Sequence, residues 1–320
     1  DLDTNFEDMA TDGFDVNALD ALFRELEFQA LQTQLNTLHG EVPTQEKRPE
    51  KDYKALTELN DIQSFINEVK EGEWLSFDLE TTSVEPMRCE IVGLSFSTKK
   101  DAGIYIPIHY KEKMTDLFDD HLNIVLDIIR PIMENKNIPK TGQNVKFDAL
   151  ILRKHGLKVN GIQFDTLLAA HLLKPESRNL KLDNLGMEHL EYRMVPITDL
   201  IGKGRNQISM AEVELEKVTF YAAEDADVAL QLTHIFKAEL KKEGLDSFFN
   251  DIELPLLPVL LEMEFNGMFV DGEMLSTMSD TLGKKIDALV ADIKKEAGTE
   301  FNVNSTQQLA NILFDIKGLP

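Results

Sequence analysis

Apolar runs and amphipathic stretches divide the middle of the chain into a strand-rich part and a helix-rich part. Three short apolar runs follow one another with brief connections, at 74–79, 91–97 and 103–108. Short runs in series favour an antiparallel meander of strands. Apolar residues at helical spacing predict helices near 61–70, 118–134, 147–155, 165–173, 181–190, 210–219 and 221–243. Strands followed by helices predict an α/β fold in which helices flank a sheet.

The first 52 residues have a different character, acidic and poor in apolar runs. Residues 1–27 contain nine acidic side chains and one basic side chain, and an amphipathic helix is predicted at about 16–35. The segment 36–52 is polar and contains three Gly or Pro residues, which predicts a linker. We therefore expect a tail and linker at 1–52, ahead of a domain at 53–247.

Residues 248–320 predict a third, purely helical part. Residues 253–264 are apolar at helical spacing, and 272–297 form a long, charged amphipathic pattern. Ser305 and Gln308 have the spacing of a capping box at the start of another helix. Because the sequence ends soon after that helix, we expect this part to be a domain that is cut short.

Composition narrows the classes of protein that this chain can be. Its 320 residues include 33 Lys and Arg against 57 Asp and Glu, a formal net charge of −24, and 42% are hydrophobic. No apolar run approaches the roughly 20 residues of a membrane span, so we expect no membrane partner. The single cysteine, Cys89, excludes an internal disulfide and fits a reducing compartment. The acidity argues against a broad phosphate-binding surface but is compatible with carboxylates that hold metal ions.

Two carboxylates stand at the end of the first predicted strand. Asp78 and Glu80 lie two apart, so a strand would point both side chains to one face of the sheet. The same Asp-x-Glu spacing recurs at 251–253 and 271–273, but only the first pair lies in a strand-like apolar run. Unpaired carboxylates are costly to bury there. A metal site and a solvated strand end both explain this pair by itself.

Two further segments hold candidate residues, and each also has a structural explanation. If a helix begins near Asn144, Asn144 and Asp148 lie on the same face of it. The structural explanation is that Asn144 caps this helix and that Asp148 is an acid of its first turn, where the helix dipole favours negative charge. Tyr221 and Asp225 lie one helical turn apart, and the two alanines between them would let that helix approach a strand closely. An ordinary helix with a buried tyrosine also explains this second pair.

Together these residues suit phosphoryl transfer with two metal ions. Hard divalent cations take oxygen ligands, and three or four carboxylates would hold a pair of them about 4 Å apart. One ion lowers the pKa of an attacking water, the other stabilises the leaving oxygen, and a phenol can orient the water. The seven histidines and one cysteine have no zinc-like spacing, and there is no Gly-x-x-x-x-Gly-Lys phosphate loop.

Three motifs carry a resemblance to a known family. They read Phe77-Asp78-Leu79-Glu80-Thr81, Gly142-Gln143-Asn144-Val145-Lys146-Phe147-Asp148 and Tyr221-Ala222-Ala223-Glu224-Asp225-Ala226-Asp227. In this order they resemble the proofreading 3′→5′ exonuclease domain of the bacterial DNA polymerase I family, the family A DNA polymerases. The loop 202–207 resembles the family as well. The segment 249–320 is similar to the start of the polymerase domain and its thumb, and 22–28 to the end of the 5′-nuclease region.

The resemblance implies a ribonuclease-H-like exonuclease fold, a mixed sheet flanked by helices, followed by a truncated all-helical segment of the polymerase thumb. It also implies two divalent metal ions, Mg²⁺ with Mn²⁺ or Zn²⁺ as alternatives. Asp78, Glu80 and Asp225 would hold one ion, and Asp78 and Asp148 the second. Tyr221 would position the nucleophilic water.

The implied partners are a single-stranded DNA 3′ end and the remainder of a polymerase chain, in a monomer of the bacterial cytoplasm close to the nucleoid. The residues implied to contact DNA are Gln143, Asn144, Lys146, Arg178 and Val84. Bases stack on apolar surfaces without much sequence preference, which suits proofreading. Phe147 stands where some relatives carry Tyr, so one phosphate hydrogen bond is absent.

Because the four carboxylates and the tyrosine are all present, we expect an active nuclease that releases deoxynucleoside monophosphates from 3′ ends. We expect the polymerase and 5′-nuclease catalytic residues to lie outside these 320 residues. One alternative is a catalytically silent domain that only supports a polymerase. Another is a stand-alone exonuclease resembling ribonuclease D, against which the polymerase-like segment 249–320 argues.

Overall fold

The computed structural model describes residues 15–25, 28, 31, 34–35, 51–109, 120–204 and 207–320. The chain forms two compact units, 1–265 and 266–320, which are described separately. The acidic residues 1–14, all of the predicted linker before residue 51, and residues 205–206 of the loop 202–207 lie outside the described residues. The domain boundary predicted at 247/248 stays a prediction. The two compact units meet between residues 265 and 266, near the end of the helix that follows the predicted boundary.

A five-stranded mixed sheet forms the centre of the first unit. Its strands lie in the order β1 (Asp52–Ala55), β4 (Ala102–Pro107), β3 (Ile91–Lys99), β2 (Leu75–Thr81) and β5 (Lys140–Thr141). β2, β3 and β4 form the predicted antiparallel meander, which is confirmed. The edge strands β1 and β5 pair in parallel with β4 and β2. Sequence analysis missed both edge strands, because two to four residues are too few to show a periodic pattern.

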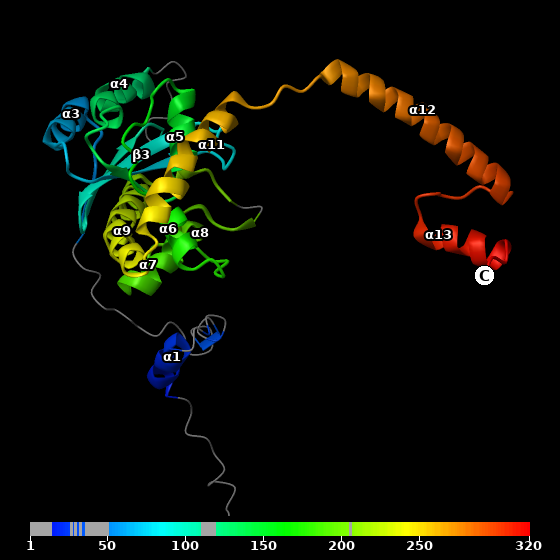
Figure 1. Ribbon diagram of the computed structural model, residues 1–320, viewed down its shortest axis with the longest axis horizontal. Helices are drawn as coiled ribbons and strands as arrows, with labels where there is room; N and C mark the ends of the chain where they lie inside the picture. The colour runs from blue at the N-terminus through cyan, green and yellow to red at the C-terminus, as the bar shows by residue number, and fades with distance from the viewer. Residues whose placement is uncertain are drawn as a thin grey trace, which may run out of the picture. The chain divides into compact units, whose positions relative to one another are not determined.

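Helices surround the sheet and connect its strands (Figure 1). The described helices of residues 51–266 are α3 (Leu59–Glu68), α4 (His121–Met133), α5 (Val145–Lys154), α6 (Thr166–Leu173), α7 (Leu182–Leu190), α8 (Ile197–Ile201), α9 (Leu215–Lys242), α10 (Asp246–Phe248) and α11 (Leu254–Asn266). A further helix, α1 (Val16–Glu25), lies in the predicted tail. None of the described helices is long and apolar enough to cross a membrane.

One helix replaces two that the sequence predicted. The patterns at 210–219 and 221–243 indicated separate helices, which is wrong, since α9 is continuous from Leu215 to Lys242. Only a short 3₁₀ turn, Met210–Glu212, precedes it, and Ser209 and Glu212 close that turn with a capping box. Nothing between residues 219 and 222 breaks a helix, so tertiary packing extends it through the predicted gap.

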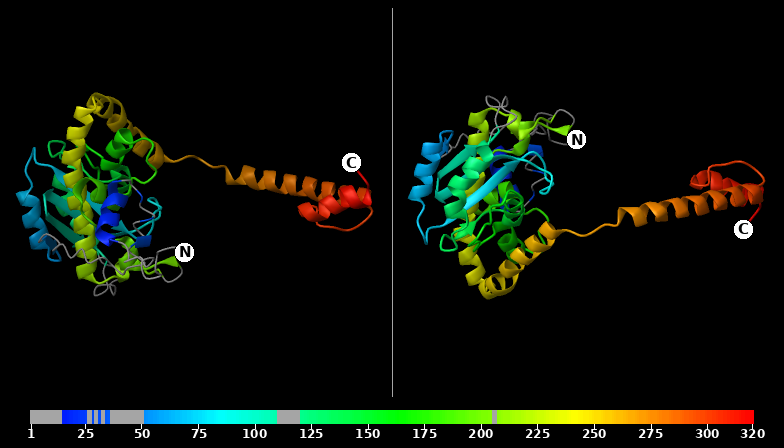
Figure 2. Two further views of the ribbon diagram at one scale, coloured as in Figure 1. Left: turned by 90° about the horizontal axis from the view of Figure 1, so that it is seen from below. Right: turned by 90° about the horizontal axis from the view of Figure 1, so that it is seen from above.

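The two faces of the sheet differ in what they bury. Leu75, Phe77 and Leu79 on β2 belong to a large apolar core together with side chains of α3, α4 and α5. The alternate residues of β2 point to the other face, which α9 crosses (Figure 2). The first motif therefore lies on a strand whose one face is packed in the core while the other faces α9.

α9 lies very close to the sheet, as its two small residues led us to expect. Ala222 and Ala223 are completely buried. A Cβ atom added to Gly103 of β4 would lie 2.8 Å from the Ala223 carbonyl oxygen, so only glycine fits there. This contact fixes the distance between α9 and the strands beside it.

A buried ion pair also fastens β1 to α9. The Lys51 side chain is 4% exposed, and its ammonium lies 3.0 Å from the Asp227 carboxylate and 2.6 Å from that of Asp101. The Tyr53 hydroxyl donates a hydrogen bond of 2.7 Å to Asp227, and the backbone N–H of Asp101 donates one of 2.9 Å. Asp227 is thus a structural acid that joins the start of the sheet to the helix.

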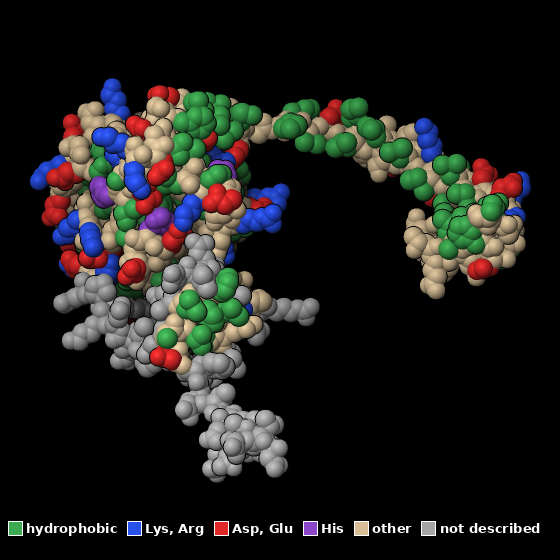
Figure 3. Space-filling view, turned by 60° about the horizontal axis from the view of Figure 1, so that its bottom comes forward, with side chains coloured by type: hydrophobic (Ala, Val, Ile, Leu, Met, Phe, Trp, Pro, Cys, Tyr) green, Lys and Arg blue, Asp and Glu red, His purple; other side chains and the backbone are tan. Residues whose placement is uncertain are grey.

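The second unit is helical where the structure describes it. It contains α12 (Gly272–Ala297), in agreement with the prediction, α13 (Thr306–Ala310) and a π-helical turn, Asn311–Ile316. The capping box predicted for Ser305 and Gln308 is only half formed, because the Gln308 side chain accepts from the backbone N–H of Asn302 instead. Apolar side chains along α12 are exposed (Figure 3).

We predict that Asp227→Asn lowers the free energy of unfolding by about 3 kcal/mol, because it leaves the Lys51 charge buried with one partner fewer. Urea unfolding followed by circular dichroism measures the change. Asp52→Asn is the matched control, since Asp52 pairs with Lys54 at the surface, where both side chains are more than half exposed. Its effect should stay within about 0.5 kcal/mol. Equal effects of the two substitutions would contradict the role given to the buried pair.

Candidate metal centre

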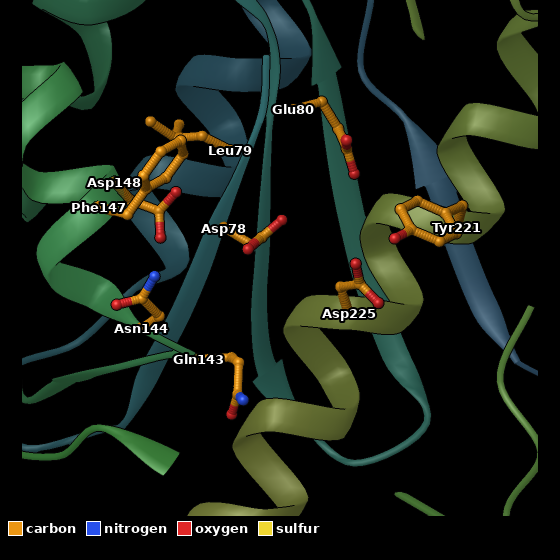
Figure 4. Close-up of a pocket in the computed structure, with 9 residues that line it drawn as sticks. All are labelled: Asp78, Leu79, Glu80, Gln143, Asn144, Phe147, Asp148, Tyr221 and Asp225. Carbon is orange, nitrogen blue, oxygen red and sulfur yellow. The ribbon is translucent and has the colours of Figure 1, made fainter. Parts of the chain in front are cut away.

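Two elements bring together the residues of the first and third motifs. Asp78 and Glu80 project from β2 toward α9, and Tyr221 and Asp225 project from successive turns of α9 toward β2 (Figure 4). Asp78, Glu80 and Asp225 each have a carboxylate oxygen within 4.8 Å of the others. The predicted alternatives of a solvated strand end and an ordinary helix with a buried tyrosine do not account for this convergence.

The second motif forms another wall of the same site. Asp148 lies on α5, is 3% exposed, and its carboxyl group lines the cavity. Together the three motifs enclose a cavity of about 200 Å³. The residues that line it are Asp78, Leu79, Glu80, Gln143, Asn144, Phe147, Asp148, Tyr221 and Asp225 (Figure 4).

Burial and mutual repulsion dominate the electrostatics of the site. Burial raises the pKa of Asp78 to about 7. Burial, and then repulsion from Asp78, raise the pKa of Glu80, Asp148 and Asp225 well above the usual range. A nearby cation would stabilise the ionised form of such clustered carboxylates and lower their pKa.

The donor set fits a hard divalent cation. One oxygen of Glu80 is buried and has no hydrogen-bond partner among the described residues. A buried acceptor of this kind is costly unless something else satisfies it. Carboxylate oxygens are the ligands that Mg²⁺ and Mn²⁺ prefer. Asp78, Glu80 and Asp225 can hold one such ion, with Asp148 on the other side of the cavity.

The phenol of Tyr221 stands at the edge of the carboxylate cluster. Its hydroxyl faces the Asp225 carboxylate, one helical turn away (Figure 4). Burial, together with the negative charges of Asp225, Glu80 and Asp78, raises the pKa of Tyr221 far above its usual value. The hydroxyl therefore keeps its proton at neutral pH and remains a hydrogen-bond donor.

The other acids of the third motif serve the scaffold. Glu224 is completely buried, and its carboxylate accepts hydrogen bonds from the Tyr192 hydroxyl at 2.6 Å and the Val195 N–H at 2.8 Å. Asp227 holds Lys51 as described above. Of the three acids at 224–227, only Asp225 lines the cavity.

Asp165 is a site-shaping residue that sequence analysis missed. Its carboxylate is buried and accepts hydrogen bonds from the backbone N–H groups of Asn144 and Val145 at 3.2 and 2.9 Å. It also accepts from Leu167 and Leu168 at 2.9 and 3.3 Å, so one side chain caps α5 and α6 together. An Asp directly before an apolar helix signals a cap of α6, but nothing in the sequence reveals its second role.

Asn144 therefore does not cap α5 through its side chain, contrary to the structural explanation considered for it. Asn144 is the residue directly before the helix, and its backbone has a left-handed conformation, with φ 58° and ψ 45°. Asn tolerates this conformation better than most residues. The hydrogen bond from its N–H to Asp165 holds the backbone in place, and its side chain faces the cavity (Figure 4).

The residues implied to contact DNA are distributed unevenly. Gln143 and Asn144 line the cavity, although the Gln143 amide also donates to the Leu180 carbonyl at 2.9 Å and accepts from Thr166 at 2.5 Å. Lys146 points to α11 and pairs with Glu264. Val84 is 88% exposed, and neither it nor Arg178, which is also exposed, lines the cavity.

Comparison with known proteins points to one family. Residues 53–241 match the model of the family A DNA polymerase domain described as a 3′-5′ exonuclease. DNA polymerase I of Pseudomonas aeruginosa is 33% identical over 315 residues, which are 95% of this chain and 34% of that protein. DNA polymerase I of Chloroflexus aurantiacus is 35% identical over 295 residues, 90% of this chain and 30% of that protein. The chain thus spans about a third of these curated relatives.

Solved structures agree on the fold. The polymerase domain of Pol1 from M. smegmatis, in complex with DNA primer-template and dNTP, has a TM-score of 0.62 at 21% identity, covering 83% of this chain and 41% of that chain. Brucella melitensis NrnC has a TM-score of 0.50 at 18% identity, covering 68% of this chain and 93% of that chain. The predicted ribonuclease-H-like mixed sheet with flanking helices is confirmed.

We predict that the metal-free protein becomes less stable as the pH rises from 5 to 8. Its buried carboxyls, with a pKa of about 7 for Asp78, bind protons that the unfolded chain has already lost. Asp78→Asn should therefore increase the free energy of unfolding by about 1–3 kcal/mol more at pH 8 than at pH 5. Urea unfolding in EDTA across this range measures both.

Asp251→Asn is the control for this experiment, because Asp251 has the same Asp-x-Glu spacing but is exposed and does not belong to the described carboxylate cluster. Excess Mn²⁺ should reverse the order at pH 8, since it stabilises the parent more than the Asp78 variant. If the Asp78→Asn variant were less stable than the parent in EDTA at pH 8, the ionised Asp78 carboxylate would not destabilise the metal-free protein, and the prediction would be wrong.

We predict that Asp165→Asn lowers the free energy of unfolding by about 2 kcal/mol or more, because the amide offers only one acceptor oxygen to four backbone N–H donors. Affinity for Mn²⁺ should fall as well, since Asp148 lies in the first turn of the helix that Asp165 caps. Urea unfolding and calorimetric titration with Mn²⁺ measure the two effects. Asp183→Asn, an exposed first-turn acid of α7, should change neither. Unchanged Mn²⁺ affinity in a destabilised Asp165 variant would limit its role to the fold.

Proposed function

The chain belongs to the family A DNA polymerase 3′-5′ exonuclease family, and from this premise we propose that it hydrolyses the 3′-terminal phosphodiester of DNA and releases deoxynucleoside monophosphates. The observation that carries the proposal is the convergence of three carboxylates within 4.8 Å beside Asp148 and Tyr221 in one cavity. A domain that only supported a polymerase would have no need of these buried, mutually repelling acids.

Asp78, Glu80, Asp148 and Asp225 would hold two divalent ions, Mg²⁺ or Mn²⁺. When bound, such ions lower the pKa of a water and stabilise negative charge on the leaving oxygen. The contribution of the chain is to hold these ligands in place before substrate arrives. β2 fixes Asp78 and Glu80, the cap by Asp165 fixes the start of α5 before Asp148, and the packing of α9 fixes Asp225.

Tyr221 would orient the attacking water. Its hydroxyl stays protonated and lies beside Asp225, so it can donate to an oxygen placed among the carboxylates. Phe147 lines the cavity without a polar group and would pack against the terminal nucleotide. Asn144 and Gln143, with Lys146, Arg178 and the exposed Val84 further out, would contact the single-stranded 3′ end.

We further propose that this segment works as the proofreading part of a DNA polymerase I, with the polymerase catalytic residues outside these 320 residues. The identity of 33–35% to two DNA polymerases I over at least 90% of the chain supports this. A stand-alone exonuclease resembling ribonuclease D is the second candidate, and a choice of substrates separates the two.

We predict that the chain shortens a 5′-labelled single-stranded DNA oligonucleotide stepwise from its 3′ end in Mg²⁺, and not in EDTA. Asp225→Asn should reduce the rate about 10³-fold, because it removes one of the negative charges that would bind the metal ion. Tyr221→Phe should reduce it roughly ten- to hundredfold through poorer orientation of the water. Single-turnover gel assays measure these rates, with a matched RNA oligonucleotide in parallel.

Asp251→Asn is the control in this assay too, because it makes the same chemical change in an exposed Asp-x-Glu pair outside the cavity. It should retain the parent rate. Faster degradation of RNA than DNA would favour the stand-alone exonuclease. No degradation by folded parent protein in either Mg²⁺ or Mn²⁺ would favour a silent domain.

A further inference from the structure

The cationic face of α5 is covered by α11. Lys146 and Arg153 lie seven residues apart, which is about two turns of α5, so their side chains project from one face of that helix. They are only partly exposed, at 28% and 27%. The last turns of α11 lie alongside this face (Figure 1).

Several contacts hold the end of α11 in this position. Leu257 is 4% exposed and belongs to the large apolar core of the first unit. Glu262 accepts hydrogen bonds from both terminal nitrogens of Arg153, and the guanidinium lies 4.2 Å from the centre of the Phe265 ring. Glu264 pairs with the ammonium of Lys146. Two neighbouring acids of α11 thus each neutralise one cation of α5.

The two ion pairs differ in their position relative to the cavity. Lys146 lies in the first turn of α5, between Asn144 and Phe147, which both line the cavity. Arg153 lies about 10 Å further along the helix, given a rise of about 1.5 Å per residue. A strand with its end in the cavity would meet the first turn of α5 before it met Arg153, and Lys146 lies in that first turn. Its flexible side chain can reach a phosphate only if it leaves Glu264.

We propose that Glu264 competes with DNA phosphates for Lys146 and so weakens the binding of a single strand to the nuclease site. The inference rests on the proposed function, because it takes the cavity as the site of a DNA 3′ end. Glu264 is 45% exposed, and exposed ion pairs are weak enough for a phosphate to replace the carboxylate. Freed from this competition, Lys146 would offer its full charge to the strand.

The test compares two substitutions that change the net charge equally. We predict that Glu264→Gln binds a 5′-fluorescein-labelled oligodeoxythymidylate about two- to fivefold more tightly than the parent, in EDTA to prevent cleavage. Glu262→Gln, on the same helix but paired with Arg153, should bind as the parent does. Fluorescence anisotropy measures the dissociation constants, and circular dichroism shows that each variant is folded.

Epistasis and salt dependence identify Lys146 as the group that is released. In a Lys146→Gln background, Glu264→Gln should give no gain in affinity. With Lys146 present, Glu264→Gln should steepen the dependence of log affinity on log salt by about 0.7, the value for one further phosphate contact on a single strand. Equal gains from both Glu substitutions, or a gain that persists without Lys146, would overturn the proposal, and so would the absence of any gain.

Failure of the inference is distinguishable from failure of the proposed function. If the parent degrades DNA in Mg²⁺ while the two Glu variants bind alike, only the competition for Lys146 is wrong. If the folded parent neither binds nor degrades DNA, the proposed function fails and the inference fails with it.

Discussion

Repulsion among buried carboxylates is the constraint on which this site depends. Burial raises the pKa of Asp78, and burial followed by repulsion from Asp78 raises the pKa of Glu80, Asp148 and Asp225. Such a group opposes folding until a cation enters, so it persists only where stronger packing holds it. That packing is the contact of α9 with the sheet, where Ala223 lies against Gly103 and no side chain separates helix from strand. Affinity for metal and local instability therefore have one origin.

The acids that surround the site show how the same chemistry serves two purposes. Glu224, Asp227 and Asp165 are completely or almost completely buried, and each accepts hydrogen bonds from specific donors. Asp227 is paired with Lys51, and Asp165 faces the N-terminal N–H groups of two helices, where a negative charge is favoured. Glu80, in contrast, keeps one buried oxygen without a partner. Satisfied acids build the scaffold, and the unsatisfied one marks where a ligand is needed.

The sequence predicted the parts of the site that depend on local periodicity. A strand at 74–79 placed Asp78 and Glu80 on one face, and a helical turn placed Tyr221 beside Asp225. The meander and most helices followed from the same patterns. What it could not show depends on pairing between distant segments. β5 is two residues long and exists because it pairs with β2, while the second role of Asp165 and the bond from Lys51 to Asp227 join residues 20 and 176 positions apart. The spacing from Tyr221 singled out Asp225, but the hydrogen bonds that make Glu224 a scaffold acid come from Tyr192 and Val195, about 30 residues away in the chain.

A net charge of −24 is compatible with the proposed binding of a DNA end. Affinity for nucleic acid depends on the cations a strand meets, and salt screens charges more than about 10 Å away. On α5, Lys146, the cation next to the cavity, is already paired with an acid of α11. Under the proposed function, a 3′ end would gain little from Lys146 and most from metal ions held by the carboxylates. We therefore expect the site to bind a strand end weakly unless metal is present. That property would suit the proposed role in proofreading, because a correctly paired end must leave the site more often than it is cut.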